Sequence, residues 1–381
     1  MMRRHAASLL ALSCVLFGGV PEAQVESHLV WTHDDGGTGW TPRHVALGDH
    51  GTQVFAHASL NHTAAMLLSS YDSDSPTVVW ELPTDTAQAL MVDSAETASV
   101  HASITFRPTE TPTPHVIEVR KWSSNSATPD WTYTYPQLVA GRLAVAVQRD
   151  GRFVLAMIPR PGADRHYDVL AFRAESGELF SQSEVPTVGE GGPLWNFDMA
   201  TDGRHLAFSL GDTAYVYEWS TKTILLTVQD PEQFSGKGIG ISAKGEVMAL
   251  GGVAGNGQVR VFERLAGGYL HRFSYPGPTG SNGNAIAVSD DASTVAVGYG
   301  FAYPSTTVEI HAFDVASQSN TMLDVHSSSG SQQNHPTDIE ITPKGRLFVV
   351  GELGDEPDLV PELRIYASRQ DLPIHTVNLS G

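Results

Sequence analysis

The chain has 381 residues, a formal net charge of −19 at pH 7 and a single cysteine. A strongly acidic surface repels phosphate backbones, which argues against a nucleic-acid partner. One cysteine excludes an internal disulfide, so an apolar core must hold the fold together, and a chain of this length can supply one.

The first residues have the pattern of an export signal. Two arginines precede an apolar run from Leu9 to Val20, and Ala23 offers a small residue for cleavage. The run is too short to cross a bilayer, and no later segment has the composition of a membrane span. We therefore expect residues 1–23 to be a signal peptide and residues 24–381 to be one exported domain, extracellular or periplasmic. An uncleaved anchor and a lipoprotein signal ending at Cys14 remain alternatives.

A repeat runs through the rest of the chain. Seven times, an apolar residue is followed three places later by an aromatic residue that ends a strand-like run. The pairs are Leu68 with Tyr71, Val119 with Trp122, Val169 with Phe172, Val216 with Trp219, Val259 with Phe262, Ile310 with Phe313, and Leu363 with Tyr366. A period of roughly 50 residues is typical of one propeller blade per repeat.

A tight polar turn precedes each aromatic residue and keeps the same period. In five repeats the turn ends in glycine, at Gly51, Gly151, Gly203, Gly245 and Gly345. Asp290-Asp291-Ala292 and Ser94-Ala95-Glu96 hold this place in the other two repeats. Such turns between β-branched apolar runs are strong hairpin signals, because glycine accepts the positive φ that tight turns require.

These markers predict an all-β fold, a seven-bladed β-propeller of four-stranded antiparallel blades with the aromatic residues packed between blades. No segment has convincing helical periodicity. We expect Leu29 to Thr32 to complete the final blade beside the strand Thr376 to Leu379. Eight blades, or six blades with an appendage, are less economical alternatives.

The turn-plus-aromatic repeat resembles the WD40-like and quinoprotein-like β-propellers over roughly residues 29–379. The Trp-Asp and Gly-His pairs of WD40 repeats are lacking, and the Ser-Gly turn of quinoprotein repeats occurs convincingly once, within Val169 to Leu179. The resemblance therefore implies an architecture and no particular function.

The lengths of the connections point to one working face. The turns between first and second strands are short, whereas the second-to-third and blade-to-blade connections are long, varied and expected on the same face. Loops on a rigid scaffold are where binding usually occurs. The candidate ligand-binding residues in or beside these long connections are Arg165, His166, Trp195, Asn196, Tyr303, His335 and Glu352. Aromatic side chains beside acids and amides suit a peptide or a sugar.

The sequence carries few signals for a metal or for catalysis. Asp72 and Asp74 alternate in a turn and are weak candidates for a calcium site, although such pairs more often solvate a turn. No His-x-x-x-His or Gly-x-Ser-x-Gly spacing is present, so the sequence assigns no catalytic residue and requires no cofactor.

The leading hypothesis is an exported binding or interaction propeller with a protein, peptide or glycan ligand and no chemistry of its own. One alternative is an enzyme at the channel mouth: a quinoprotein-like dehydrogenase, or a calcium-assisted lactonase or glycan-cleaving enzyme. The other alternative is a structural surface protein.

Overall fold

The computed structural model describes only part of the chain. The described residues are 40–48, 53–60, 66–72, 78–84, 88–94, 100–107, 116–123, 125–137, 142–160, 163–185, 194–200, 202–229, 238–251, 257–301, 305, 307–327, 336–352, 362–369 and 375–378. The expected signal peptide, the run from Leu29 to Thr32, and Asp74, Tyr303 and His335 lie outside them.

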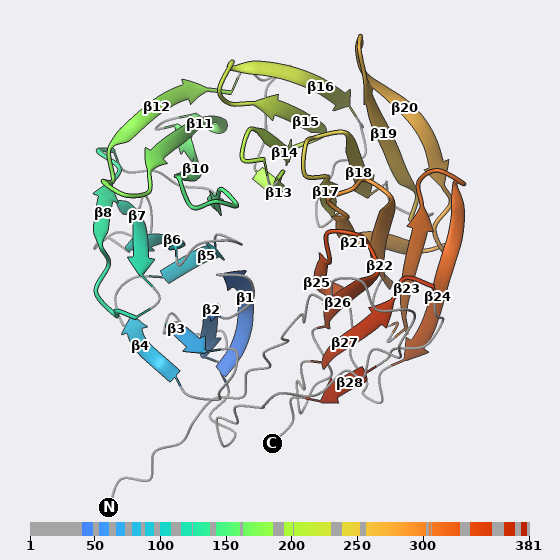
Figure 1. Cartoon of the computed structure of the whole chain (residues 1–381), viewed down its shortest axis with the longest axis horizontal. Helices are drawn as coiled ribbons and strands as arrows, with labels where there is room; N and C mark the ends of the chain where they lie inside the picture. The colour runs from blue at the N-terminus through green and yellow to red at the C-terminus, as the bar shows by residue number, and fades with distance from the viewer. Residues whose placement is uncertain are drawn as a thin grey trace, which may run out of the picture. The chain divides into compact units, whose positions relative to one another are not determined.

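All regular secondary structure in the described residues is β-strand, in seven four-stranded sheets (Figure 1). The sheets fall into two compact units divided between Gln182 and Ser183, and each unit is described by itself.

The first unit contains three sheets. Their strands are β1 (Trp40–Gly48), β2 (Gln53–Leu60), β3 (Met66–Asp72) and β4 (Val78–Thr84); β5 (Gln88–Ser94), β6 (Val100–Arg107), β7 (Val116–Ser123) and β8 (Trp131–Thr134); and β9 (Ala144–Val147), β10 (Phe153–Arg160), β11 (Ala163–Arg173) and β12 (Leu179–Glu184).

The second unit contains four sheets. Their strands are β13 (Leu194–Met199), β14 (His205–Leu210), β15 (Thr213–Glu218) and β16 (Thr223–Gln229); β17 (Ile239–Ile241), β18 (Val247–Gly251), β19 (Val259–Leu265) and β20 (Gly268–Tyr275); β21 (Ser281–Val288), β22 (Thr294–Phe301), β23 (Thr307–Asp314) and β24 (Ser319–Ser327); and β25 (Pro336–Ile341), β26 (Leu347–Glu352), β27 (Glu362–Ala367) and β28 (His375–Asn378).

Within every sheet the strands follow chain order, and neighbouring strands pair antiparallel, as β1 does with β2 and β10 with β11. The predicted four-stranded antiparallel repeat is therefore confirmed. One end of each sheet, where the first strand begins and the second ends, is called its loop end. The opposite end, where a short turn joins the first and second strands, is called its turn end.

The predicted hairpin turns have the expected backbone. Gly151, Gly203, Gly245 and Gly345 have φ between 62° and 68°. Each donates its N–H to the carbonyl three residues earlier, at 2.7–2.9 Å. Ala292 takes the same place without glycine, at φ 59°. The left-handed conformation of the turn is thus kept even where the residue carries a Cβ.

Aromatic residues of the third strands are buried as predicted. Trp122, Phe172, Phe313 and Tyr366 have no exposed surface, and Phe262 is 7% exposed. Several belong to apolar clusters that join neighbouring sheets within one unit. The core of each unit therefore lies between its sheets.

The sequence-based assignment is wrong by two residues in the fourth repeat. Tyr217 pairs with Leu206 just as Phe262 pairs with Met248, so Tyr217 is the equivalent aromatic residue. Trp219 lies two residues further on, and its backbone N–H donates to the carbonyl of Arg204 at 3.2 Å. The sequence pattern selected Trp219 instead of Tyr217, because either aromatic residue could end a strand-like run.

Candidate functional site

The structure places the described loop candidates at the loop ends of their own sheets. Trp195 and Asn196 are the second and third residues of β13, Arg165 and His166 lie near the start of β11, and Glu352 ends β26. His166 is half-buried.

Asp72, the weak metal candidate, ends β3, where register with Gln53 places it at the turn end. In the described part of the chain, no group of three or more His, Cys, Asp or Glu side chains is arranged to hold a metal ion.

A β-bulge near the loop end recurs in five of the seven first strands. The pairing between first and second strands shifts by one residue in each case. The extra residues are Arg43, Leu90, Trp195, Asn284 and Thr337. A bulge leaves one residue outside the regular ladder and increases the local twist, and bulges are over-represented beside active sites, where they re-aim side chains. The bulge therefore places Trp195 outside the regular hydrogen-bonding ladder between β13 and β14.

A polar cluster that the sequence analysis missed lies in the first unit, on the same strand as Arg165 and His166. Asp168 is 4% exposed and accepts a hydrogen bond from Gln182 Nε2 at 2.7 Å. Tyr135 Oη donates to the same carboxylate at 3.4 Å, and Arg160 Nε lies 3.5 Å from it. Burial, and then the negative charge of Asp168, raise the pKa of Tyr135 to about 12. Tyr135 therefore stays protonated and joins two neighbouring sheets through Asp168.

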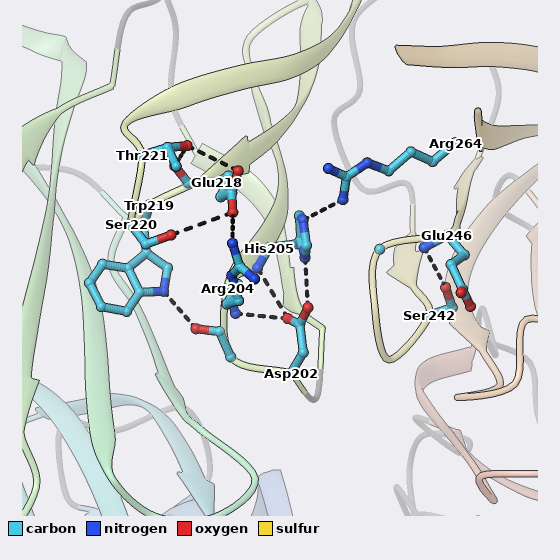
Figure 2. Close-up of polar contacts among 12 residues, drawn as sticks. Asp202, Arg204, His205, Glu218, Trp219, Ser220, Thr221, Ser242, Glu246 and Arg264 are labelled. Carbon is cyan, nitrogen blue, oxygen red and sulfur yellow. Dashed lines mark hydrogen bonds and ion pairs between the residues drawn. The ribbon is translucent and has the colours of Figure 1, made fainter. Parts of the chain in front are cut away.

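A larger network occupies the turn ends of two neighbouring sheets in the second unit (Figure 2). Asp202 lies in the turn before β14, and its carboxylate accepts from the backbone N–H of Arg204 at 2.8 Å. The same carboxylate lies 2.9 Å from Nδ1 of His205, whose side chain is 5% exposed. Asp202 thus binds its own turn and fixes the imidazole ring.

The end of β15 joins this network through Glu218. Its carboxylate accepts hydrogen bonds from Arg204 at 2.5 Å and from Thr221 Oγ1 at 3.0 Å. Although burial opposes ionisation, the hydrogen bonds from Thr221 and Arg204 together hold the pKa of Glu218 below its ordinary value. Trp219 donates its indole N–H to the carbonyl of Gly203 at 2.6 Å. Third strand and hairpin turn are therefore tied together by side chains.

The neighbouring sheet completes the network. Arg264 on β19 approaches Nε2 of His205 at 2.6 Å, and the N–H of Asp202 donates to the carbonyl of Ala243 at 2.8 Å. A Cβ at Gly245 would lie 2.9 Å from the ring of His205. Tyr269 Oη donates to the carbonyl of Gly245, and burial raises the pKa of this tyrosine. The packed turns therefore leave room only for glycine at position 245.

These contacts define the chemistry of His205. Arginine only donates, so Nε2 must accept, and the proton is on Nδ1 facing Asp202. Both ring nitrogens are therefore engaged. Such a histidine acts as a rigid bridge between two sheets. Sequence reasoning found the Asp-Gly turn but had no signal for Arg264, which meets His205 only after the sheets pack.

Two sequence comparisons give no relative: no protein-family model and no curated protein matches the chain. We also find, within the described residues, no helix with the length and apolarity to span a bilayer.

A comparison with solved structures identifies the fold. The chain is similar to the β-propeller domain of Cps50 (Swd1) from Myceliophteria thermophila, with a TM-score of 0.56 and 12% sequence identity. The likeness covers 83% of this chain and 93% of that domain. The β-propeller architecture expected from the repeat is therefore confirmed, and at this identity the likeness establishes the fold alone.

Proposed function

We propose that this chain is an exported seven-bladed β-propeller that binds a protein or peptide partner at the loop ends of its blades. Seven four-stranded sheets in the described residues support the blade number. The propeller fold supports a binding role because it is a rigid scaffold, and loops on a rigid scaffold are where binding usually occurs.

The five bulged first strands carry the proposal. They begin at the loop ends of their sheets, and one of the extra residues is Trp195. Tryptophan is among the residues that contribute most to binding energy in protein interfaces. A bulge repeated in five sheets is a deliberate feature of the backbone rather than a defect of one strand.

The turn ends support the same choice of face by contrast. Asp202, His205 and Arg264 contact one another in sequence, and Glu218 joins them through Arg204 (Figure 2). A ligand that engaged these polar groups would have to break the hydrogen bonds they already make, which costs free energy. The described network at the turn ends therefore has a structural role.

The proposal is tested with peptide and glycan arrays probed by the purified mature protein. The strongest array peptide is then titrated calorimetrically against the wild type, Trp195→Ala and Leu270→Ala. Leu270 is a matched control, because it is 59% exposed and lies at a turn end. We expect Trp195→Ala to weaken binding by at least about tenfold and Leu270→Ala to leave it unchanged. Binding only to glycans, or loss of binding with Leu270→Ala alone, contradicts the proposal.

Export has its own test. The arginines, the apolar run and Ala23 support cleavage after residue 23. N-terminal sequencing of protein recovered outside the cytoplasm should begin at Gln24. An intact Met1 in cytoplasmic protein contradicts this part of the proposal.

A further inference from the structure

Several third strands carry an acidic residue at one fixed position, four residues before the buried aromatic residue. The structure describes three of these side chains: Glu118 on β7, Asp168 on β11 and Glu309 on β23. In each of these sheets the aromatic residue pairs with the second residue of the second strand. The three carboxylates therefore hold equivalent places and can be compared directly.

Two of these carboxylates are paired with an arginine of their own sheet. Arg120 Nη2 lies 2.5 Å from the carboxylate of Glu118, and Arg160 Nε lies 3.5 Å from that of Asp168. Tyr135 also donates its hydroxyl to Asp168 from the preceding sheet. At this position of the repeat, a carboxylate thus binds a guanidinium.

Glu309 has no such cation. His311 stands where β7 has its arginine, and its Nδ1 lies 3.3 Å from the amide nitrogen of Asn320, which only donates. The proton is therefore on Nε2, which donates to Glu309 at 3.1 Å. Burial lowers the pKa of His311 despite the charge of Glu309, so the ring is neutral at pH 7. Among the described residues, Glu309 makes no further hydrogen bond or ion pair.

A buried hydroxyl beside Glu309 also lacks a partner. Tyr299 on β22 pairs directly with Glu309, so the two side chains lie on the same face of the sheet. Tyr299 has no exposed surface, and its Oη makes no hydrogen bond in the described part of the chain. Burial, and then the nearby Tyr275 and Glu309, raise the pKa of Tyr299. An unpaired buried hydroxyl costs free energy, which a ligand that donates to it recovers.

The preceding sheets differ in what they place over the carboxylate. Tyr133 and Tyr275 are equivalent, because each packs on the aromatic residue of the next third strand, with ring centroids 4.8 and 3.7 Å apart. Two residues after Tyr133, Tyr135 reaches Asp168. Two residues after Tyr275 the chain has Gly277, which has no side chain. The carboxylate on β23 therefore has no counterpart of Tyr135 over it.

We infer that Glu309, Tyr299 and Tyr275 form a binding site for the arginine side chain of a peptide partner. The guanidinium pairs with the carboxylate of Glu309, whose side chain is 20% exposed, and donates to the hydroxyl of Tyr299. It packs along the ring of the half-buried Tyr275. Its methylene stem lies on Val325, which pairs with Glu309 and is 54% exposed.

The repeat itself favours arginine over lysine, because the two equivalent carboxylates pair with guanidinium groups. A planar group with several donors also reaches a carboxylate and a hydroxyl at once. The site lies at the loop ends, since Tyr275 ends β20 and Glu309 is the third residue of β23. The inference deepens the proposed function and rests on it for the peptide that carries the arginine.

Calorimetric titration of the full mature chain with N-acetyl-L-arginine amide tests the site directly. We expect a Kd of roughly 1 mM, and at least about tenfold weaker binding of the uncharged N-acetyl-L-citrulline amide. Binding should weaken between about 0.05 M and about 0.5 M NaCl, because salt screens a partly exposed ion pair. Equal binding of both compounds, or no binding of the arginine compound at roughly 20 mM, overturns the inference. Tighter binding of N-acetyl-L-lysine amide overturns the choice of arginine.

Three variants locate the contact. Glu309→Gln keeps the shape of the side chain and should weaken binding by at least about tenfold. Glu263→Gln is the matched control, a third-strand glutamate paired with Arg272, and should have no effect. Tyr299→Phe should weaken binding roughly threefold without lowering the urea midpoint, because its hydroxyl has no partner in the free chain. Retained binding in Glu309→Gln, equal loss in Glu263→Gln, or a lower midpoint for Tyr299→Phe contradicts the inference.

A fourth variant fills the site from within. His311→Arg places an arginine two residues after Glu309, as Arg120 follows Glu118, and should abolish binding of the arginine compound. Binding that persists in a folded His311→Arg chain overturns the inference, and Glu309→Gln decides if that chain does not fold. The titration of the array peptide depends on Trp195 instead, so the proposed function and this site can fail separately.

Discussion

The turn between β13 and β14 and the turn between β21 and β22 have the same backbone conformation but different side chains. Each sends the N–H of an aspartate to a carbonyl in the turn of the next sheet along the chain. Asp202 donates to Ala243 at 2.8 Å, and Asp291 donates to Pro343 at 3.1 Å. The repeated backbone bond therefore fixes how neighbouring turns meet, whatever side chains surround it.

The side chains complete these two turns with different chemistry. The first turn uses charged groups and a histidine, with Arg264 reaching His205 from the next sheet. The second uses hydroxyl groups: Ser289 donates to Asp291 at 2.8 Å and accepts the N–H of Thr294 at 3.0 Å. The backbone of the repeat thus determines how the turns of neighbouring sheets meet. The side chains at this junction between turns determine how its stability responds to pH and salt.

The largest expected effect comes from filling the space beside His205. Gly245→Ala puts a Cβ at φ 66° and 2.9 Å from the imidazole ring. Backbone strain and overpacking should together lower the free energy of unfolding by about 3 kcal/mol. Urea denaturation followed by tryptophan fluorescence measures this loss.

Two controls separate strain from crowding at this position. Gly280 has φ 83° with nothing within 4 Å of an added Cβ, so Gly280→Ala should cost only about 1 kcal/mol. His205→Ala removes the crowding ring, so the double variant with Gly245→Ala should lose less than the two single losses added together. Strict additivity would show that the imidazole does not fill this space.

A smaller effect is expected from pH at the charged junction, the turn between β13 and β14 with Glu218 and its partners. The pKa of Glu218 is lowered in the folded state, so its stabilisation is present above its ordinary pKa and is lost as the pH falls through the lowered value. Glu218→Gln should cost about 1–2 kcal/mol at pH 7 and should flatten the fall in stability between about pH 5 and about pH 3. Urea midpoints across this pH range provide the measurement.

The hydroxyl junction supplies the comparison. Burial opposes ionisation of Asp291, but hydrogen bonds from Ser293 and Ser289 hold its pKa low, so acid also weakens this turn. No cation faces Asp291 among these partners, so the cost of Asp291→Asn should change less with added salt than the cost of Glu218→Gln. Equal salt dependence would remove the distinction between the two junctions.

Much of the fold follows from local sequence. An apolar alternation around Asp-Gly or Lys-Gly turns specifies hairpins, and an aromatic residue in each third strand specifies the period. The pattern failed where Tyr217 and Trp219 compete two residues apart, because both side chains fit a buried strand end. Register is fixed by pairing with β14, and pairing across a sheet is invisible in one segment of sequence.

The candidate site was less predictable. The sequence placed Trp195 and Asn196 beside a long connection, but the bulge at Trp195 depends on how β13 pairs with β14. The contact of Tyr135 with Asp168 and the bridge from His205 to Arg264 join residues of different sheets that are far apart in the sequence. Such contacts exist only after the sheets pack, so composition and spacing could not reveal them.

The smallest expected effect tests the shared backbone itself. Ala292 and Gly203 hold the same turn position, at φ 59° and 65°. Ala292→Gly relieves the strain of the left-handed conformation, but it removes a partly buried methyl group and increases the conformational entropy of the unfolded chain. Because these effects oppose one another, the free energy of unfolding should rise by no more than about 0.5 kcal/mol. Gly203→Ala introduces the strain without relief and should cost about 1 kcal/mol. If Ala292→Gly instead costs more than Gly203→Ala, the methyl group outweighs the backbone at this position, and the two turns are alike in shape but not in what stabilises them.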